Sequence, residues 1–469
     1  MSIRPEELYL NESYDFDVTI ETKGGKFAGT LKLSPQRITL TIMGEQHAKR
    51  KCDIVWQDIE TLICKDTNTT FFLMGLRNVE YRGHLIEFLP QKISYFESKY
   101  EVENVIYCPT DQFGEIYFTS INIHSKTVRE WLGNTIKQEN IIGKYKSGGN
   151  LFNDDSLSTE FSYKINNFGL IGIHYNTSLH HSSPAFKAGI VFPPSLFLIF
   201  ESLKTTDEII NTYYDLYTLL SFLTGDELEV EKINASYMPD CFSKSATIYY
   251  PREKMPKRNE DSCILFPLSK NLRFDTLCLP ELPLSIFDAY FGHDDTHKGY
   301  MRKYFRYRRM ENVEERFLGY FRILESLCYI RKDYLEEKLL LDLAKKARKY
   351  LIKKFGDKKG VDSFIKNLSW FNSLKYNTEK CLQEFFKKIP SKYVEKWKFG
   401  KSDIGRICKL RNDITHANNY YTSEAEIEAY AKFVEVLLIL ALFLKLGVNL
   451  EQSLIIINRL NGFLLITNN

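Results

Sequence analysis

The sequence lacks several patterns that mark common classes of protein. Its nine cysteines are far apart and never form a C-x-x-C pair, which excludes the usual zinc-ribbon and thioredoxin-like spacings. It has no P-loop, no G-x-S-x-G and no dinucleotide-binding fingerprint, so nucleotide hydrolysis and serine-hydrolase chemistry are disfavoured. No internal repeat of about 20 to 50 residues is visible. The scattered thiols are typical of reduced, mostly buried cysteines in a cytosolic protein.

Long hydrophobic runs are also missing. Residues 436–444 are nine consecutive apolar residues bracketed by Glu435 and Lys445, whereas about 20 are needed to cross a bilayer. We expect a helix buried on all sides, in the core or at a subunit interface, and no membrane partner. The start, MSIRPEELYLNESYDFDV, has no apolar core before a cleavage site, so a secretory signal is not expected. The predicted location is therefore cytoplasmic.

The net charge of +3 conceals an uneven distribution of charge along the 469 residues. Residues 1–300 carry 30 Lys and Arg against 40 Asp and Glu, a net of −10, whereas residues 301–469 carry 33 against 20, a net of +13. Such asymmetry indicates an anionic partner for the basic part, most often nucleic acid. Lysine-rich helix faces can also be simply solvated, and that alternative stays open.

The length predicts two or three domains, and the residue patterns divide the chain into three modules. Residues 1–145 contain short runs of period-two alternation separated by turn residues, which predict an antiparallel sandwich or partly closed barrel. Residues 146–298 are mixed, with a strand expected at 189–200 and a helix at 206–224. Residues 299–469 have almost purely helical periodicity. The predicted fold class is therefore α+β multidomain, with a β-rich amino-terminal region followed by an all-α bundle.

The string Arg411-Asn412-Asp413-Ile414-Thr415-His416 is the most chemically suggestive in the sequence. By itself the pattern is weak, because about 0.4 Arg-x4-His pairs are expected by chance in such a chain. A second match with six spacers, from Arg77 to His84, falls in the β-rich region, where we interpret it as surface sheet. The first match lies between an amphipathic helix and a long apolar one, inside the basic helical part.

This arrangement resembles the HEPN family of small helical bundles, in which an R-x4-6-H motif marks metal-independent endoribonucleases. Residues 316–327 are similar to the first helix of that family and carry an acidic residue, Glu325. The chain as a whole resembles the ApeA group of anti-phage abortive-infection proteins, in which a β-rich region precedes a HEPN domain. The resemblance implies an RNA partner, such as a host or phage tRNA, and a phage-derived trigger acting on the amino-terminal region.

The residue types of the motif suit RNA cleavage by the 2′-hydroxyl, which needs a base, an acid and a cation for the phosphorane. Histidine can act as acid or base near neutral pH. Arginine keeps its charge and offers a planar fork that matches two phosphate oxygens. No ligand set for a metal surrounds the motif, so we expect neither metal nor cofactor. The expected products carry 2′,3′-cyclic phosphate and 5′-hydroxyl ends.

Helix geometry places a further constraint on the motif. Five positions along a straight helix leave Arg411 and His416 roughly 140° apart, so we expect a helix end or turn between them, for which Asn412 and Asp413 are suitable residues. A single histidine also leaves one proton transfer without a group. In the HEPN family a dimer brings two motifs to one cleft, and residues 436–444 are a candidate dimer surface.

The predicted catalytic residues are Arg411 and His416, with Asn412, Asp413 and Glu325 in supporting roles. Each has a plainer interpretation: His416 could cap a helix end, and Arg411 could form a structural bridge with Asp413 or Glu325. The helical part could instead bind RNA, a nucleotide or a phage protein without cutting, or serve mainly to dimerise the chain. The residues from His293 to His297 could bind a divalent metal, but a polar linker between domains is preferred.

Overall fold

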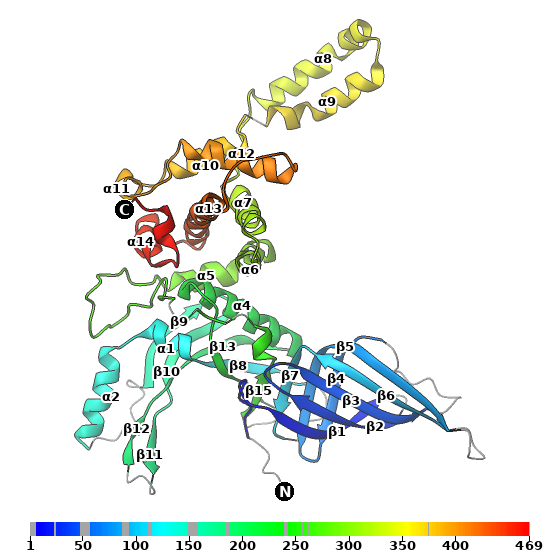
Figure 1. Ribbon diagram of the computed structural model, residues 1–469, viewed down its shortest axis with the longest axis vertical. Coiled ribbons are helices and arrows are strands. Elements are labelled where there is room, and N and C mark those ends of the chain that lie inside the picture. Colours follow the sequence, from blue (N-terminus) through cyan, green and yellow to red (C-terminus); the bar gives the residue numbers. More distant parts are fainter. Residues whose placement is uncertain are drawn as a thin grey trace. The chain divides into compact units, whose positions relative to one another are not determined.

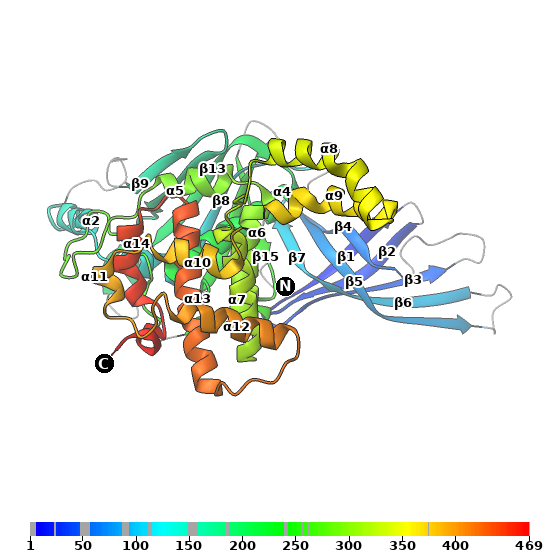
Figure 2. The ribbon, with the colours of Figure 1, turned by 90° about the horizontal axis from the view of Figure 1, so that it is seen from above.

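The fold is described by a computed structural model, which covers residues 6–22, 25–46, 57–86, 93–110, 115–148, 158–182, 187–238, 243–255, 257–259, 262–373 and 375–468. The chain divides into two compact units, Met1–His293 and Asp294–Asn469 (Figures 1 and 2). The first is built on strands and the second on helices. The predicted α+β class, a β-rich region followed by a helical bundle, is confirmed.

The first unit contains an antiparallel sheet of thirteen strands. Their spatial order is β4-β1-β2-β3-β6-β5-β7-β15-β14-β8-β13-β10-β9. The strands are β1 (Tyr14–Thr22), β2 (Gly25–Leu33), β3 (Ile38–Gln46), β4 (Ile59–Asp66), β5 (Thr69–Ile86), β6 (Ile93–Val102), β7 (Asn104–Cys108), β8 (Phe118–Ser125), β9 (Thr159–Ile165), β10 (Gly169–Tyr175), β13 (Pro194–Lys204), β14 (Val230–Tyr237) and β15 (Lys244–Tyr249). A separate ribbon pairs β11 (Ser178–Ser182) with β12 (Lys187–Val191).

Six of these strands close into a barrel. β4 pairs with β1 on one edge and with β5 on the other, so β4-β1-β2-β3-β6-β5 returns on itself. Apolar and polar residues alternate along these strands, so that each strand has one face to bury inside the barrel. In β1, for example, Phe16, Val18 and Ile20 are buried between exposed neighbours. Burying each such side chain contributes roughly 1.5–3 kcal/mol. The barrel-like fold expected from the alternation is therefore present.

The sheet continues across the boundary that the sequence indicated near residue 145. β8 pairs with β13 and β14, and β7 pairs with β15. Residue 145 itself lies inside α2 (Ile136–Lys146). The modules expected at 1–145 and 146–298 are thus one unit, because strands of both share one hydrogen-bonded ladder. The unit ends at His293, close to the expected boundary at 298.

Helix α4 (Thr206–Thr224) occupies the residues predicted for it and is mostly buried. Its N-cap residue is Thr205. The Thr205 hydroxyl accepts from the Glu208 amide, and the Glu208 carboxylate accepts from the Thr205 amide, which is a capping box. Gly225, at φ 76°, ends the helix in the left-handed conformation that glycine favours.

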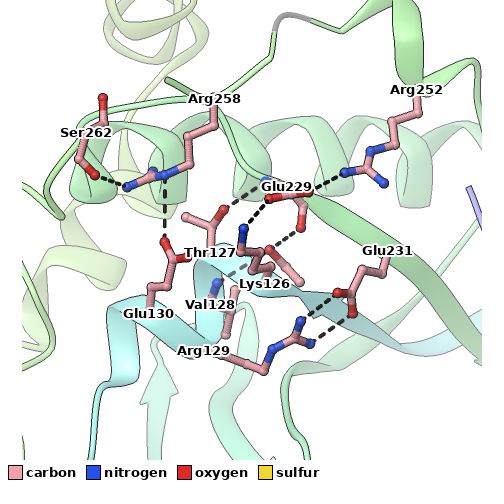
Figure 3. A network of polar contacts seen from close by, with 11 residues as sticks. Lys126, Thr127, Val128, Arg129, Glu130, Glu229, Glu231, Arg252, Arg258 and Ser262 are labelled. Atoms are coloured by element: carbon pink, nitrogen blue, oxygen red, sulfur yellow. Dashed lines mark hydrogen bonds and ion pairs between the residues drawn. The ribbon is translucent and has the colours of Figure 1, made fainter. Parts of the chain in front are cut away.

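Charged side chains connect the short helix α1 (Lys126–Leu132) to β14 and to the segment after β15 (Figure 3). Arg129 donates two hydrogen bonds, of 2.9 and 2.6 Å, to the carboxylate of Glu231. Glu229 accepts from Arg252 at 2.9 Å. The Arg129 partner holds the pKa of Glu231 below its usual range despite partial burial. The network fixes α1 against the sheet, where Trp131 is fully buried.

The second unit consists of helices joined by short loops. They are α6 (Asp295–Arg308), α7 (Val313–Cys328), α8 (Glu337–Phe355), α9 (Lys358–Asn372), α10 (Thr378–Phe386), α11 (Ser391–Val394), α12 (Asp403–Thr415), α13 (Glu424–Lys445) and α14 (Leu450–Ile456). Asp294 begins this unit by capping α6, its carboxylate accepting from the His297 amide at 3.0 Å and pairing with the His297 ring at 2.6 Å. In the described ranges no group of three or more His, Cys, Asp or Glu is placed to hold a metal ion.

Helix α13 forms the centre of the bundle and packs on α7. Every residue from Val434 to Phe443 is buried within the chain's own unit. This corrects the prediction that residues 436–444 provide a dimer surface, because their side chains already contact the surrounding helices. Glu435 is buried among them and accepts a 2.8 Å hydrogen bond from the Tyr304 hydroxyl. None of the helices in the described ranges has the length and apolar composition needed to cross a membrane.

Candidate active site

The motif residues lie at the carboxyl end of α12. The helix continues through Asn412 and Asp413 and ends at Thr415, so His416 is its C-cap residue. A helix end therefore does fall inside the motif, as the 140° argument required, but at His416 and not at the two residues that the sequence favoured. The reason lies downstream, in the residues that terminate the helix.

A Schellman motif ends α12. The Asn418 amide donates to the Asp413 carbonyl at 2.8 Å, and the Ala417 amide donates to the Ile414 carbonyl at 3.2 Å. Ala417 takes the left-handed position, with φ 53°. Glycine is usual there, because a Cβ at such φ costs roughly 1–2 kcal/mol. The backbone at His416 is thus held by a cap that includes one strained residue.

Arg411 is fixed by three neighbours. Its Nη2 donates to Glu325 Oε2 at 2.8 Å, and its Nη1 donates to Asn412 Oδ1 at 2.9 Å. The guanidinium carbon lies 5.4 Å from the centre of the Phe321 ring, a cation–π distance. The side chain remains 26% exposed. Arg411 therefore has a fixed direction and still reaches solvent.

Glu325 stands on the last turn of α7 and links two other helices. One carboxylate oxygen accepts from Arg411 on α12, and the other accepts from the Thr378 hydroxyl at the start of α10. Glu325 thus forms an ion pair with Arg411, the structural bridge of the plainer interpretation, and its predicted supporting role stays a prediction. The carboxylate orients Arg411 and partly neutralises it.

His416 is exposed, and within the described residues its side chain has no hydrogen-bond or ion-pair partner. The structure brings Arg411, Asn412 and Glu325 together but gives no contact between Arg411 and His416. Asp413, predicted to have a supporting role, accepts a hydrogen bond from the Asn418 side-chain amide at 3.3 Å. The exposed imidazole of His416 and the partly exposed guanidinium of Arg411 are each open to an incoming ligand.

A thiol and a phenol near the motif are held in their neutral forms. Burial, and then the nearby carboxylates of Glu379 and Glu325, raise the pKa of the Cys408 thiol to about 12. A hydrogen bond to Glu314 raises the pKa of Tyr420 to about 12. Neither a thiolate nor a phenolate is therefore available near neutral pH.

Four residues that shape the site were not assigned to it from the sequence. Phe321 was assigned only to a buried helix face, and Thr378 lies 53 residues from its partner Glu325. Ala417 carries no local signal, because alanine is uncommon at a left-handed position. Asn418 gave a weak sequence signal, since asparagine is frequent around helix ends.

Comparison with known families agrees with this geometry. A family model described as ApeA N-terminal domain 1 matches residues 16–277, and one described as Apea-like HEPN matches residues 318–452. The second range contains Glu325, Arg411 and His416. Searches among curated proteins and among solved structures gave no match.

The β-rich unit and the helical bundle with its Arg-x4-His motif define the class of protein, an ApeA-type amino-terminal domain joined to a HEPN domain. The first matched range covers more than half of the 469 residues. The chain belongs to the ApeA family. HEPN domains are generally ribonucleases, so the matches indicate a nuclease effector related to defence.

Proposed function

We propose that this chain is a metal-independent endoribonuclease that acts in anti-phage defence by abortive infection. The observation that supports this best is the joint exposure of Arg411 and His416 at one helix end inside the HEPN range. The amino-terminal unit would sense a phage-derived trigger, and the helical unit would then cut host or phage RNA, tRNA being one candidate.

In the proposed reaction the 2′-oxygen attacks the adjacent phosphorus while the bond from phosphorus to the 5′-oxygen breaks. One histidine takes the proton of the 2′-hydroxyl, and a second protonates the departing 5′-oxygen. The remaining donors of Arg411 would hold the charge that develops on the phosphoryl oxygens, a preorganised electrostatic role. The products are a 2′,3′-cyclic phosphate and a 5′-hydroxyl.

The second histidine would come from a homodimer, as His416 of the other copy. Residues 436–443 are poor candidates for that contact, since they are buried in their own bundle. The exposed loop that follows His416, which includes the fully exposed Tyr421, is accessible to a second chain. Light scattering that found a monomer at every concentration, together with full activity, would contradict the dimer.

The test compares wild type with Arg411→Ala and His416→Ala on total cellular RNA in EDTA, with mapping of the new ends. Arg406→Ala is the matched control, because Arg406 is an exposed arginine on the same helix. We expect each motif variant to lose about 10²-fold or more in cleavage and to lose infection protection, while the control retains both. Retained cleavage in folded His416→Ala, or a requirement for a metal ion, would refute the proposal.

One observation favours a second candidate, a module that binds RNA, a nucleotide or a phage protein without cutting it. Arg411 already has an acidic partner in Glu325, as an arginine with a purely structural role would. Intact RNA after incubation with the triggered protein would favour this alternative.

A further inference from the structure

Helices α8 and α9 form a hairpin that extends away from the other helices of its unit (Figure 1). Both helices are described in full, and only Ala344, Val361 and Asn372 in them are buried. Asn372 closes the base: its side chain accepts from the Leu335 amide at 2.9 Å and donates to the Leu335 carbonyl at 2.8 Å. The hairpin is thus a small lobe with a fixed base and almost no core of its own.

The hairpin is strongly basic. Between residues 337 and 372 there are ten Lys and Arg against four Asp and Glu, a net of +6. Three of the four acids have local partners: Asp362 pairs with Arg348, Glu337 pairs with Arg331, and Asp357 caps α9. The nine lysines are exposed and form no ion pair with any described residue: Lys338, Lys345, Lys346, Lys349, Lys353, Lys354, Lys358, Lys359 and Lys366. The excess positive charge therefore faces solvent.

Large apolar and aromatic side chains alternate with these lysines. Along α8, Leu339, Leu343, Lys346, Tyr350 and Lys353 follow helical spacing on one exposed face. The exposed fractions of Leu339, Leu343 and Tyr350 are 66%, 65% and 66%. Exposed apolar side chains of this size in one element indicate a surface for a partner.

Helix α9 also combines exposed lysines with an exposed aromatic side chain. Lys359, Lys366 and Trp370 share a face at spacings of seven and four residues, and Trp370 is 60% exposed. Positive charge interleaved with exposed aromatic rings is the pattern that proteins use to bind single-stranded nucleic acid.

The base of the hairpin lies beside the candidate active site. Glu325, which holds Arg411, stands three residues before the end of α7, the helix that leads into the hairpin. Thr378, which also bonds to Glu325, is the first residue of α10, the helix that follows the hairpin. Both connections of the hairpin therefore start from the residues that position Arg411.

We propose that the α8–α9 hairpin is an RNA-binding arm of the nuclease. Its lysines contact phosphates, and Tyr350 and Trp370 stack on unpaired bases, so that an RNA held on the arm lies next to Arg411. The inference rests on the proposed function for the identity of the polyanion. It assigns to the arm a substrate with an unpaired stretch, such as a loop, in preference to a continuous duplex.

Two other occupants fit less well. A helix that lies on a membrane keeps its charged and apolar residues on separate faces, whereas Lys346 stands between Leu343 and Tyr350 on the same face of α8. Pairing with the hairpin of a second copy would bring two net charges of +6 together, which like-charge repulsion opposes. RNA satisfies both the charge and the exposed rings.

The test measures binding of a fluorescent 20-nucleotide single-stranded RNA by anisotropy, in the full-length His416→Ala background so that the probe stays intact. The arm variant is Lys346→Glu/Lys353→Glu/Lys366→Glu. The matched control is Lys32→Glu/Lys146→Glu/Lys164→Glu, an equal charge change on exposed lysines of the first unit. We expect the arm variant to bind at least tenfold more weakly and to lower the salt slope by about 2, and the control to stay within twofold.

A second variant, Tyr350→Ala/Trp370→Ala, separates stacking from charge. We expect it to lose about tenfold on the single strand and little on a blunt duplex of equal length. Unchanged affinity in both arm variants, with thermal unfolding like that of the parent, would overturn the proposal. The proposal would also be overturned if the arm variants altered only the oligomeric state, or altered only the binding to anionic vesicles as measured by sedimentation. If wild type binds RNA through the arm but never cleaves it, the proposed function fails while the arm stands.

Discussion

Arg411 on α12 donates a 2.8 Å hydrogen bond to Glu325 on α7, 86 residues away in the sequence. The pair joins two helices and fixes the direction of the guanidinium. It also places a negative charge where a phosphate would approach. A bound RNA must therefore use the donors of Arg411 that Glu325 and Asn412 leave open.

Glu325→Gln should increase RNA affinity about three- to tenfold, because it keeps an acceptor for Arg411 and removes the opposing charge. Glu325→Ala should lower cleavage about tenfold, since Arg411 then loses its anchor. Stability should change by less than about 1 kcal/mol in either case, as both side chains are partly exposed. Anisotropy, cleavage assays and urea unfolding measure these effects; an unchanged affinity in Glu325→Gln would show that the pair has only a structural role.

Replacing Ala417 tests the cap that holds His416. Ala417→Gly should raise the free energy of unfolding by about 0.5–1 kcal/mol, because glycine adopts φ 53° without strain. Ala417→Val should lower it by about 1–2 kcal/mol and reduce cleavage by displacing His416. Denaturant unfolding of the full chain provides the measurement, with Ala429→Gly, in the middle of α13, as a control of opposite expected sign.

The buried carboxylate of Glu435 stabilises the bundle through its partners. It accepts from Tyr304 at 2.8 Å and pairs with Lys432 at 2.5 Å. Burial raises the pKa of Glu435, but the positive charges of Lys432 and Arg308, together with hydrogen bonds, lower it by more. The pKa of Glu435 therefore lies below its usual range. Glu435→Leu should cost about 3–5 kcal/mol, because it strands the charge of Lys432. The double variant Lys432→Met/Glu435→Leu should recover most of that loss; if it does not, packing and not the stranded charge is responsible.

The first unit should lose stability in mild acid because of His124. Burial, aided by Lys232 and opposed by Glu7, lowers the pKa of His124 to about 4. In the unfolded chain the imidazole takes up its proton near pH 6.5. Between pH 6.5 and pH 4 the unfolded state therefore binds more protons than the folded state, and the free energy of unfolding decreases as the pH is lowered. We expect a loss of about 2 kcal/mol from pH 7 to pH 5.

Urea unfolding followed by tryptophan fluorescence reports on this unit through the buried Trp131 once Trp370 and Trp397 of the helical unit are replaced by Phe. His124→Gln should flatten the pH dependence, whereas His297→Gln, in the helical unit, should leave it as in the wild type. An equally steep loss of stability in His124→Gln would assign the effect to other groups.

Local patterns in the sequence predicted the regular elements well. Residues 206–224 form a helix with the expected limits, since the apolar spacing, the acidic first turn and Gly225 all agree. Long strands were harder to predict: the alternation in residues 1–145 indicated only short runs, whereas β5 extends without a break from Thr69 to Ile86. Its two halves pair with different neighbours, which no local pattern records. Residues 87–89 lie outside the described range.

In the candidate site, too, the sequence predicted the features that depend on local spacing and missed those that depend on tertiary packing. The Arg411–His416 spacing indicated a helix end, because periodicity is a local property. Its position followed from Ala417 and Asn418, which close the helix one turn later than Asn412 and Asp413 suggested. The hydrogen bond of Thr378 to Glu325 and the burial of residues 436–444 depend on tertiary packing. The charge asymmetry was visible from composition, but its concentration on α8 and α9 required the structure.

The pairing of β8 with both β13 and β14 limits how the protein can be divided for expression. A fragment that stops at residue 145 would leave β8 with two unsatisfied edges and strip β7 of its partner β15. Such open edges favour aggregation. A fragment of residues 1–293 retains every strand of the ladder, so soluble production of the amino-terminal half should depend on including the last strand pair as well as the barrel.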